Sequence, residues 1–283
     1  MDPDPEAEQT ASKFVKTTLL TVVLTSCHSF QTESSTAVST IHLTLPDSTV
    51  NNSLASPPHK KKKNKTIYLT FDDGPNKGTR KVMHIAKEEQ VPITMFIIGE
   101  HVYGSAEQTA TYDSLAECSF IELDNHSFTH ANNRYEAFYS QPDSAVKDFK
   151  RCADSLGLTG NIIRTPGRNI WRTKNISCTD IKKSVITADS LQKAGFIVIG
   201  WDLEWHYDNL LQLENTGEEL LQLVDSLFAK GKTKTLNHLV LLAHDQVYAD
   251  AVDSLALVLF IEKLKTADAY NFEVISNYPG VKN

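Results

Sequence analysis

Residues 66–75 read Thr66-Ile67-Tyr68-Leu69-Thr70-Phe71-Asp72-Asp73-Gly74-Pro75, an apolar run that ends in two adjacent carboxylates. The run is rich in β-branched and aromatic residues, which is typical of a buried strand. Gly74-Pro75 predicts that the chain turns directly after the carboxylates. Because ligands bind beyond the carboxyl ends of strands in helix-covered sheets, we expect Asp72 and Asp73 to lie at a functional site. The alternative is an ordinary Asp-Asp-Gly surface turn.

From residue 66 onward, short apolar runs alternate with longer helical patterns. Strands are expected at 66–71, 92–98, 120–125, 162–165, 196–201, 238–243 and 271–275. Helices are expected at 78–89, 108–118, 143–156, 180–194, 216–229 and 250–266. This alternation predicts an α/β fold with about seven parallel strands, a barrel somewhat short of the standard eight. The alternative is an open doubly wound sheet, but no Gly-rich loop follows the first strand, so we expect no nucleotide cofactor.

The composition limits the kinds of partner and metal site that we expect for this chain. The chain has 283 residues and a formal net charge of -7, so nucleic acid is not expected as a partner. None of the four cysteines forms a C-x-x-C pair, which argues against a thiolate zinc site. Cys118, Cys152 and Cys178 are expected to be free buried thiols, with a Cys152–Cys178 bridge as the alternative.

The N-terminal 65 residues differ in character from the rest. Residues 1–27 resemble a bacterial lipoprotein signal, with lysines before a short apolar run and Leu24-Thr25-Ser26-Cys27 at its end. The acidic residues at positions 2, 4 and 6 are unusual for such a signal. Residues 28–65 are rich in Ser, Thr and Asn and then carry a basic run, which predicts a disordered tether. We therefore expect an exported protein, anchored to the membrane of the bacterial cell envelope by a lipid on Cys27, with its catalytic domain at 66–283.

A metal site is expected after the third strand, where the sequence reads His126-Ser127-Phe128-Thr129-His130. On a helical turn, the four-residue spacing would put both imidazoles on one face. Asp73 is the obvious third ligand. Two histidines, one carboxylate and a water form the open arrangement that catalytic zinc uses. The alternative is a pair of hydrogen-bonded core histidines.

Three further strand ends carry reactive residues. Arg164 follows the fourth strand and could hold a carboxylate through a bidentate pair. Trp201-Asp202-Leu203-Glu204-Trp205 follows the fifth, with tryptophans that could line a pocket or pack in the core, and acids that could orient a histidine. His244 follows the sixth and could act as a general acid.

These motifs, in this order, resemble the five motifs of polysaccharide deacetylases, the metal-dependent glycan deacetylases of carbohydrate esterase family 4. The resemblance covers residues 66–276 and includes Thr94-Met95-Phe96-Ile97-Ile98-Gly99 as a second strand. It implies a distorted (β/α) barrel. In the third motif the chain departs from the family, because Gly167-Arg168-Asn169 stands where many members carry an aromatic residue and then glycine.

The resemblance also implies roles for single residues. Asp73, His126 and His130 match the metal ligands, Asp72 the catalytic base, Arg164 its partner and His244 the catalytic acid. Either Asp202 or Glu204 matches the acid that tunes the catalytic histidine. Trp201, Trp205 and Pro166 match positions that contact substrate. The metal is expected to be Zn²⁺, with Co²⁺, Ni²⁺ or Mn²⁺ as alternatives.

The expected function is metal-dependent removal of acetyl groups from a cell-envelope or extracellular glycan, first of all the N-acetyl groups of an N-acetylhexosamine polymer. An O-acetyl glycan esterase is the alternative on the same site. Two alternative functions from other functional classes remain. One is a non-haem iron enzyme with the same ligand set, and the other is a non-catalytic glycan-binding relative.

Overall fold

The computed structural model describes residues 63–282. The predicted lipoprotein signal, Cys27 and nearly all of the predicted tether lie outside the described residues. Within the described part of the chain, no helix is both long and apolar enough to cross a membrane.

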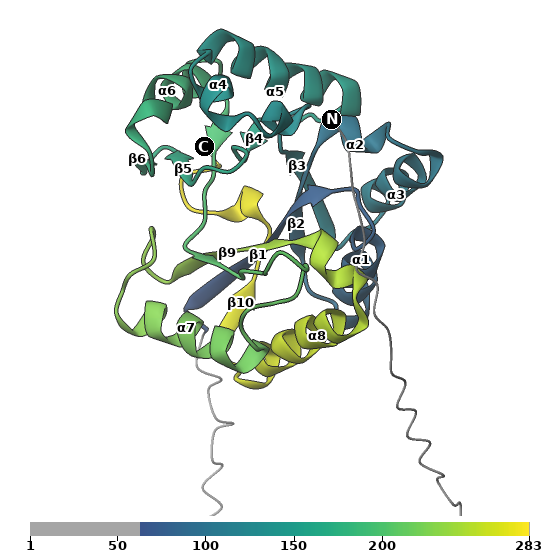
Figure 1. The fold of residues 1–283 in the computed structure, drawn as a ribbon. Coiled ribbons are helices and arrows are strands. Elements are labelled where there is room, and N and C mark those ends of the chain that lie inside the picture. Colours follow the sequence, from purple (N-terminus) through teal and green to yellow (C-terminus); the bar gives the residue numbers. More distant parts are fainter. Residues whose placement is uncertain (1–62, 283) are drawn as a thin grey trace, which may run out of the picture. The chain divides into compact units, whose positions relative to one another are not determined.

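One twisted sheet of ten strands organises the described residues (Figure 1). The strands are β1 (Lys65–Gly74), β2 (Ile93–Ile97), β3 (Ile121–Asn125), β4 (Ile162–Ile163), β5 (Ile170–Arg172), β6 (Ser177–Thr179), β7 (Ile197–Val198), β8 (Leu203–Glu204), β9 (His238–His244) and β10 (Tyr270–Phe272). Their order is β6-β5-β7-β4-β3-β2-β1-β9-β8, and β10 pairs with β1. The predicted α/β fold is confirmed, as a curled and mostly parallel sheet.

The helices lie outside this sheet, as the alternation of strands and helices predicts. They are α1 (Thr79–Glu89), α2 (Gly99–Val102), α3 (Ala106–Ala116), α4 (Tyr135–Tyr139), α5 (Pro142–Leu156), α6 (Val185–Lys193), α7 (Gly217–Ala229) and α8 (Ala251–Thr266). In Figure 1, α7 and α8 lie below β1 and β9, whereas α4, α5 and α6 lie above the sheet at the β4 and β5 end.

The longest strand, β1, is the centre of the sheet. It pairs with β9 from Thr66 to Asp72. On its other edge it pairs first with β10 and then with β2. Alternate residues of β1 enter different cores, as the pleat of a strand requires. Ile67, Leu69 and Phe71 face the helices, and Tyr68 faces a second cluster inside the curled sheet.

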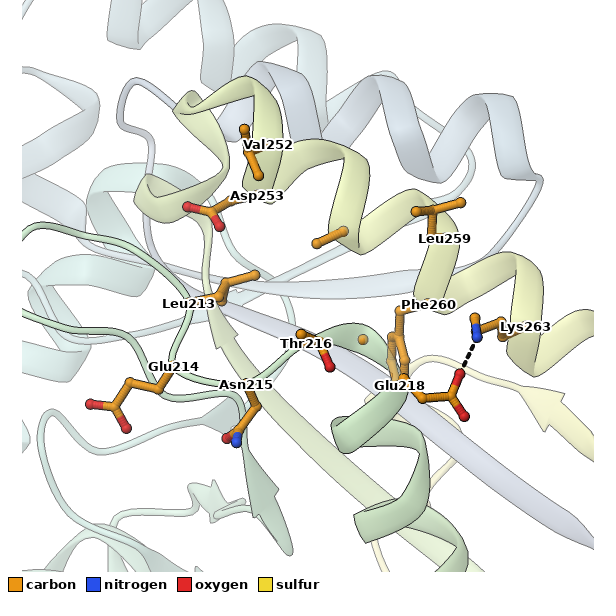
Figure 2. Close-up of a pocket in the computed structure, with 12 residues that line it drawn as sticks. Leu213, Glu214, Asn215, Thr216, Glu218, Val252, Asp253, Leu259, Phe260 and Lys263 are labelled. Carbon is orange, nitrogen blue, oxygen red and sulfur yellow. Dashed lines mark hydrogen bonds and ion pairs between the residues drawn. The ribbon is translucent and has the colours of Figure 1, made fainter.

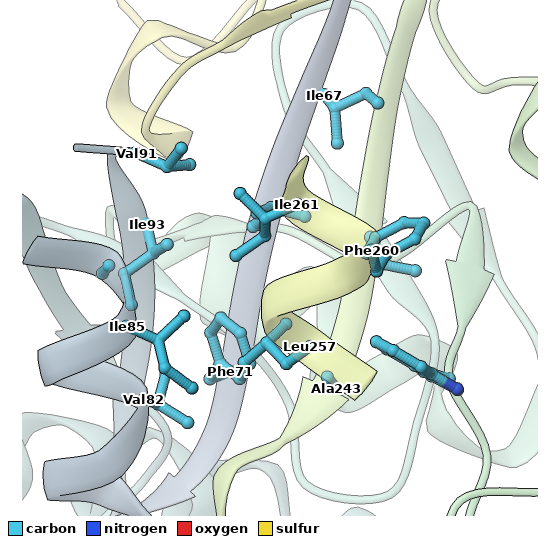
Figure 3. Packing of buried hydrophobic residues seen from close by; sticks show 14 of the residues in the cluster. Ile67, Phe71, Val82, Ile85, Val91, Ile93, Ala243, Leu257, Phe260 and Ile261 are labelled. Atoms are coloured by element: carbon cyan, nitrogen blue, oxygen red, sulfur yellow. The ribbon is translucent and has the colours of Figure 1, made fainter. Parts of the chain in front are cut away.

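The larger core fills the space between the outer face of the sheet and the helices (Figure 3). Phe71 of β1 packs there beside Val82 and Ile85 of α1 and Leu257 and Ile261 of α8. The inner core is closed by the C-terminal segment, which contributes Ile275, Tyr278 and Val281. Both faces of β1 are therefore buried, and only its carboxyl end opens into a pocket.

The differences from the predicted elements are confined to short segments. The strands expected at 162–165 and 196–201 shrink to the two-residue β4 and β7. The helix expected from 180 begins at Val185, after the 3₁₀ turn η2 (Lys182–Ser184). Three strands of two or three residues, β5, β6 and β8, were not expected, and β5 runs antiparallel to β6 and β7. Cys118, Cys152 and Cys178 are free, although only Cys152 is fully buried.

Candidate active site

Most of the residues singled out at the strand ends line one pocket of about 290 Å³. It lies at the carboxyl ends of β1, β3, β4 and β9, where a parallel sheet is expected to bind its ligand. Its lining includes Asp72, Asp73, His126, His130, Glu204 and His244. The alternative of an ordinary surface turn is therefore wrong for Asp72, which is 3 % exposed.

A bulge at the end of β1 turns both carboxylates toward this pocket. Asp72 pairs with Phe96 of β2, but the next pair is Gly74 with Ile97, so Asp73 is the extra residue. Asp73 adopts a φ of 76°, in the left-handed region. Without the bulge, adjacent strand residues would point to opposite faces. The backbone at Asp73 therefore explains how both acids reach one cavity.

Asp73, His126 and His130 form the one group of potential metal ligands found in the described part of the chain. Asp73 Oδ1 lies 3.4 Å from His126 Nε2 and 3.3 Å from His130 Nε2. His126 is buried, whereas Asp73 and His130 are half-buried and face the pocket. The three ligand atoms are thus close enough to share one cation.

A helical turn does not bring the two histidines together, so that part of the prediction is wrong. Ser127 has a φ of 70° and His130 a φ of 47°, so the backbone at both positions is left-handed and the segment is not a right-handed helical turn. The turn is held by side chains, because Ser127 Oγ accepts from His130 N and Asp148 Oδ2 accepts from Phe128 N. The imidazole rings end 5.1 Å apart, measured between centroids.

The hydrogen bonds around His126 favour a cation at this point. His126 Nδ1 lies 2.9 Å from the carbonyl oxygen of Arg164, which can only accept, so Nδ1 carries the proton. In the neutral ring, Nε2 then directs a lone pair toward Asp73 Oδ1. That oxygen is buried and has no hydrogen-bond donor among residues 63–282. Two facing acceptors are satisfied by a shared metal ion, so these residues fit a divalent metal.

The charges on Asp73 and His130 agree with this assignment, whereas His126 would have to give up any bound proton when a metal binds. Burial alone would raise the pKa of Asp73, but His126, His244 and His130 lower it well below its ordinary range. Burial and the neighbouring His126 lower the pKa of His130 to about 4. At neutral pH the site therefore offers an ionised carboxylate and a neutral imidazole, the forms that bind metal. Burial also opposes a charge on His126, but Asp72 and Asp73 outweigh it and raise its pKa.

Asp72 forms a buried ion pair with Arg164, separate from the group of metal ligands. The Arg164 guanidinium is fully buried and donates from Nη1 to Asp72 Oδ1 at 2.8 Å. The same group donates to the Thr70 hydroxyl at 2.7 Å and to the carbonyls of Ile199 and Gly200. Asp72 Oδ2 lies 3.6 Å from His126 Nε2. Asp72 is thus held at the edge of the metal group, with one oxygen occupied by Arg164.

His244 enters the pocket from the end of β9, opposite Asp72 in the register of β1 and β9. Neither acid predicted to tune it forms a hydrogen bond with it: His244 Nδ1 is buried and has no partner among the described residues. Asp202 lies away from the pocket and accepts from the backbone N–H groups of Lys234 and Val240. Glu204 lines the pocket, but its carboxylate lies 3.6 Å from His206 Nδ1.

The positions predicted to contact substrate lie in different surroundings in the structure. Trp201 lines the pocket. Trp205 does not: its side chain is 1 % exposed, packs against Tyr248 and Phe260 and donates to the carbonyl of Asn215. Pro166 is buried and does not line the pocket, and its carbonyl accepts from the Tyr139 hydroxyl. Trp205 is therefore a core residue.

The structure adds residues that the sequence did not indicate. Tyr207 lines the pocket and contacts the His244 ring at 5.2 Å, edge to face. Tyr135 lies in the same way against His130 at 5.8 Å. Asp245 is buried and accepts from Asn76 and Thr79, which ties the loop after β1 to the end of β9. Tyr135 and Tyr207 both follow irregular segments, so neither the spacing of motifs nor hydrophobic periodicity in the sequence indicates that they belong to the site.

Another hollow lies outside the active pocket (Figure 2). It has a volume of about 400 Å³ and lies between the start of α7 and the outer side of α8. Leu213, Thr216, Val252 and Phe260 line it, and Glu218 pairs with Lys263 at one end. It shares no residue with the pocket of Asp72 and His244, which remains the candidate active site.

Comparison with known proteins agrees with this geometry. The family model described as polysaccharide deacetylase matches residues 59–175. The Bacillus subtilis protein YheN, which carries a polysaccharide deacetylase name, is 30% identical over 167 residues. The match covers 53% of this chain and 52% of YheN, so the chain spans about half the length of that relative. A peptidoglycan-N-acetylglucosamine deacetylase of Bacillus cereus is 26% identical over 224 residues, 77% of this chain and 73% of the relative.

Solved structures support the fold. The catalytic domain of a peptidoglycan N-acetylglucosamine deacetylase from Eubacterium rectale aligns with a TM-score of 0.56 at 21% identity, covering 77% of this chain and 94% of that domain. A family 4 carbohydrate esterase from Streptomyces lividans aligns with a TM-score of 0.54 at 19% identity, covering 77% and 96%. In its motifs, in the family model that matches residues 59–175 and in its fold, the chain is similar to polysaccharide deacetylases.

Proposed function

We propose that this protein is a metal-dependent hydrolase that removes acetyl groups from a glycan of the cell envelope or the extracellular space. One observation carries the proposal. The metal group of Asp73, His126 and His130 shares a single pocket with the Asp72–Arg164 pair and with His244. That set supplies a cation site, a base and an acid, which a binding protein would not need together. A non-haem iron enzyme would likewise need no such base and acid.

Each group of residues in the pocket has its own role in the proposed reaction. A divalent metal held by Asp73, His126 and His130 would polarise the acetyl carbonyl and lower the pKa of a water molecule. We propose Zn²⁺, with Co²⁺, Ni²⁺ and Mn²⁺ as alternatives. Asp72 takes the proton of the attacking water, because its Oδ2 faces the metal group while Arg164 holds its Oδ1. His244 then gives a proton to the leaving amine or alcohol.

The walls of the pocket suit a small acyl group. Trp201, Tyr207 and Leu242 lie around the two acids and His244 and supply apolar surface. The relatives' names point to N-acetyl groups, since the Bacillus cereus relative is a peptidoglycan-N-acetylglucosamine deacetylase. We therefore propose an N-acetylhexosamine polymer as substrate, with O-acetylated glycans as the alternative on the same site.

The test is to incubate the full chain, loaded in turn with each of the four metals, with N-acetylated and O-acetylated glycans, and to measure released acetate. We expect release from the N-acetylated polymers, and loss of release when a chelator removes the metal. Release from O-acetylated glycans alone would replace the N-acetyl proposal. No release from any glycan by a metal-loaded protein would overturn the function.

Replacing His244 by Asn tests the acid. The substitution keeps a polar side chain but removes the titratable group, so the turnover number should fall by roughly 10²-fold. Metal content, measured on the same preparation, should not change, because His244 is not one of the three ligands. Unchanged turnover, or loss of the metal, would show that His244 has another role.

We also propose that the protein is exported and anchored by a lipid on Cys27, as its first 27 residues suggest. Mass spectrometry of protein made in a bacterial host should find Cys27 as a lipid-modified N-terminus, in the detergent phase. A soluble product that retains Met1 would contradict this.

A further inference from the structure

One arginine beside the active pocket has no carboxylate partner among residues 63–282. Arg164 pairs with Asp72 and Arg172 pairs with Asp189, but no acid pairs with Arg168. Its Nη1 donates to the carbonyl of Gly167 at 2.7 Å. Its Nε is buried and has no acceptor in the described residues. A buried donor without a partner is unfavourable, so this guanidinium has capacity for an anion that the protein does not supply.

The guanidinium is held next to the metal group by two tyrosine rings. Its Cζ lies 5.8 Å from the centre of Tyr135 and 5.5 Å from that of Tyr139. Tyr135 contacts His130 on its other side, so one aromatic ring separates Arg168 from a metal ligand. Gly167 has a φ of 59°, and a Cβ there would meet Tyr135 at 3.0 Å. The turn therefore fits closely against Tyr135 and positions Arg168.

A separate cavity of about 600 Å³ opens on the outer side of Arg168. Its lining includes Tyr139, Ser184 and Lys183, and the one acid in it, Glu136, pairs with Lys183 at 2.7 Å. Asp180 is the other nearby acid. Its two oxygens accept from the backbone N–H groups of Asn169 and Ile181. Arg168 is thus the one cation of this cavity that no carboxylate of the described residues neutralises.

We propose that Arg168 forms a subsite for a carboxylate on the sugar next to the acetylated one, so that the preferred substrate is an acidic glycan. The inference rests on the proposed deacetylase function. A guanidinium matches a carboxylate geometrically, since its planar fork can donate two parallel hydrogen bonds. Tyr135, which is half-buried and also lines the acetyl pocket, would line the path of the glycan between this subsite and that pocket.

The experiment compares three oligosaccharides with the full, metal-loaded chain. The first is a neutral N-acetylglucosamine oligomer. The second carries a carboxylate at C6 of alternate residues, and the third carries a lactyl ether at O3 of alternate residues. We expect kcat/KM, measured by acetate release, to be at least about tenfold higher for one acidic oligomer than for the neutral one. The arm that shows the increase identifies where the carboxylate lies.

Arg168→Gln should abolish this preference and leave kcat/KM for the neutral oligomer nearly unchanged. Lys193→Gln is the matched control, because it removes the same charge from an exposed position outside the cavity. Raising the salt concentration should reduce the preference of the unaltered protein. Equal kcat/KM for all three oligomers, or an equal loss on neutral and acidic oligomers in Arg168→Gln, would overturn the subsite.

A binding measurement separates this inference from the proposed function. Calorimetry with the acetyl-free acidic oligomers needs no turnover. Weaker binding by Arg168→Gln than by Lys193→Gln would support the subsite, even if no oligomer released acetate. Missing acetate release would by itself overturn only the deacetylase function. Equal binding by the two variants would overturn the subsite, whatever the activity.

Discussion

Asp73→Asn is expected to lose the metal, whereas Asp72→Asn is expected to keep the metal and lose turnover. The two acids are neighbours of identical chemistry, and only their surroundings separate them. Asp73 Oδ1 faces both imidazoles and has no donor within the described residues. A neutral amide there replaces an anionic metal ligand by a much weaker one. Asp72 is occupied on one side by Arg164, an interaction that an amide oxygen can still accept.

The substitutions suit their positions, so the comparison is not expected to fail through misfolding. Asn tolerates the left-handed backbone found at Asp73, where φ is 76°. Asn at position 72 keeps the volume of the side chain but cannot take a proton from water. Loss of a general base typically costs ~10²–10⁴-fold in rate. The loss of the metal ion should cost at least as much.

Metal content and acetate release should be measured on the same preparation of each variant. Each variant serves as the control for the other, because both remove one negative charge from one pocket. If Asp72→Asn lost the metal while Asp73→Asn kept both metal and turnover, the two roles would be reversed. Retention of full turnover by both variants would remove the carboxylates from the mechanism altogether.

The parts of the fold that the sequence predicts well are those with long apolar runs. β1, β2 and β9 contain continuous buried residues and lie within a few residues of their expected bounds. β5, β6 and β8 have two or three residues each, too few for any periodicity to show. The C-terminal segment that closes the inner core is likewise invisible as a pattern, because its role depends on tertiary packing.

The candidate site was predictable for the residues that end a strand or directly follow one, whether the strand is long, as β1 and β9 are, or short, as β4 is. Asp72, Asp73, His126, Arg164 and His244 all meet in the expected place. The neighbours of β8 were not predictable in the same way. A two-residue strand does not reveal which of Asp202, Glu204 and Trp205 faces the pocket. The structure places Asp202 on backbone amides and Trp205 in the core, and leaves only Glu204 at the pocket.

Arg164→Met is expected to destabilise the metal-free protein by about 3–5 kcal/mol, the usual cost of removing one partner of a buried ion pair. Asp72 is 3 % exposed, so without Arg164 its carboxylate stays buried and loses the guanidinium that donates to it. Methionine keeps the unbranched stem and its contact with Phe96, above which the guanidinium now lies at 4.1 Å. The loss should therefore come mainly from charge and hydrogen bonds rather than from a cavity.

The measurement is the free energy of unfolding in urea, in the presence of a chelator, because bound metal would add its own stabilisation. Arg172→Met is the control. Arg172 is also buried, but its partner Asp189 is exposed and would return to water, so the cost should be clearly smaller.

The double variant Asp72→Asn/Arg164→Met identifies the source of the loss. If the unpaired carboxylate of Asp72 dominates, neutralising it should recover part of the stability, and the two changes should not add. The loss of stability that the double variant does not recover belongs to the carbonyls of Ile199 and Gly200. These carbonyls lose their hydrogen-bond donor in Arg164→Met and in the double variant alike. Strict additivity, or a loss below about 1 kcal/mol for Arg164→Met, would show that the pair contributes little to the fold. Arg164 would then serve only to direct Asp72 toward the metal group.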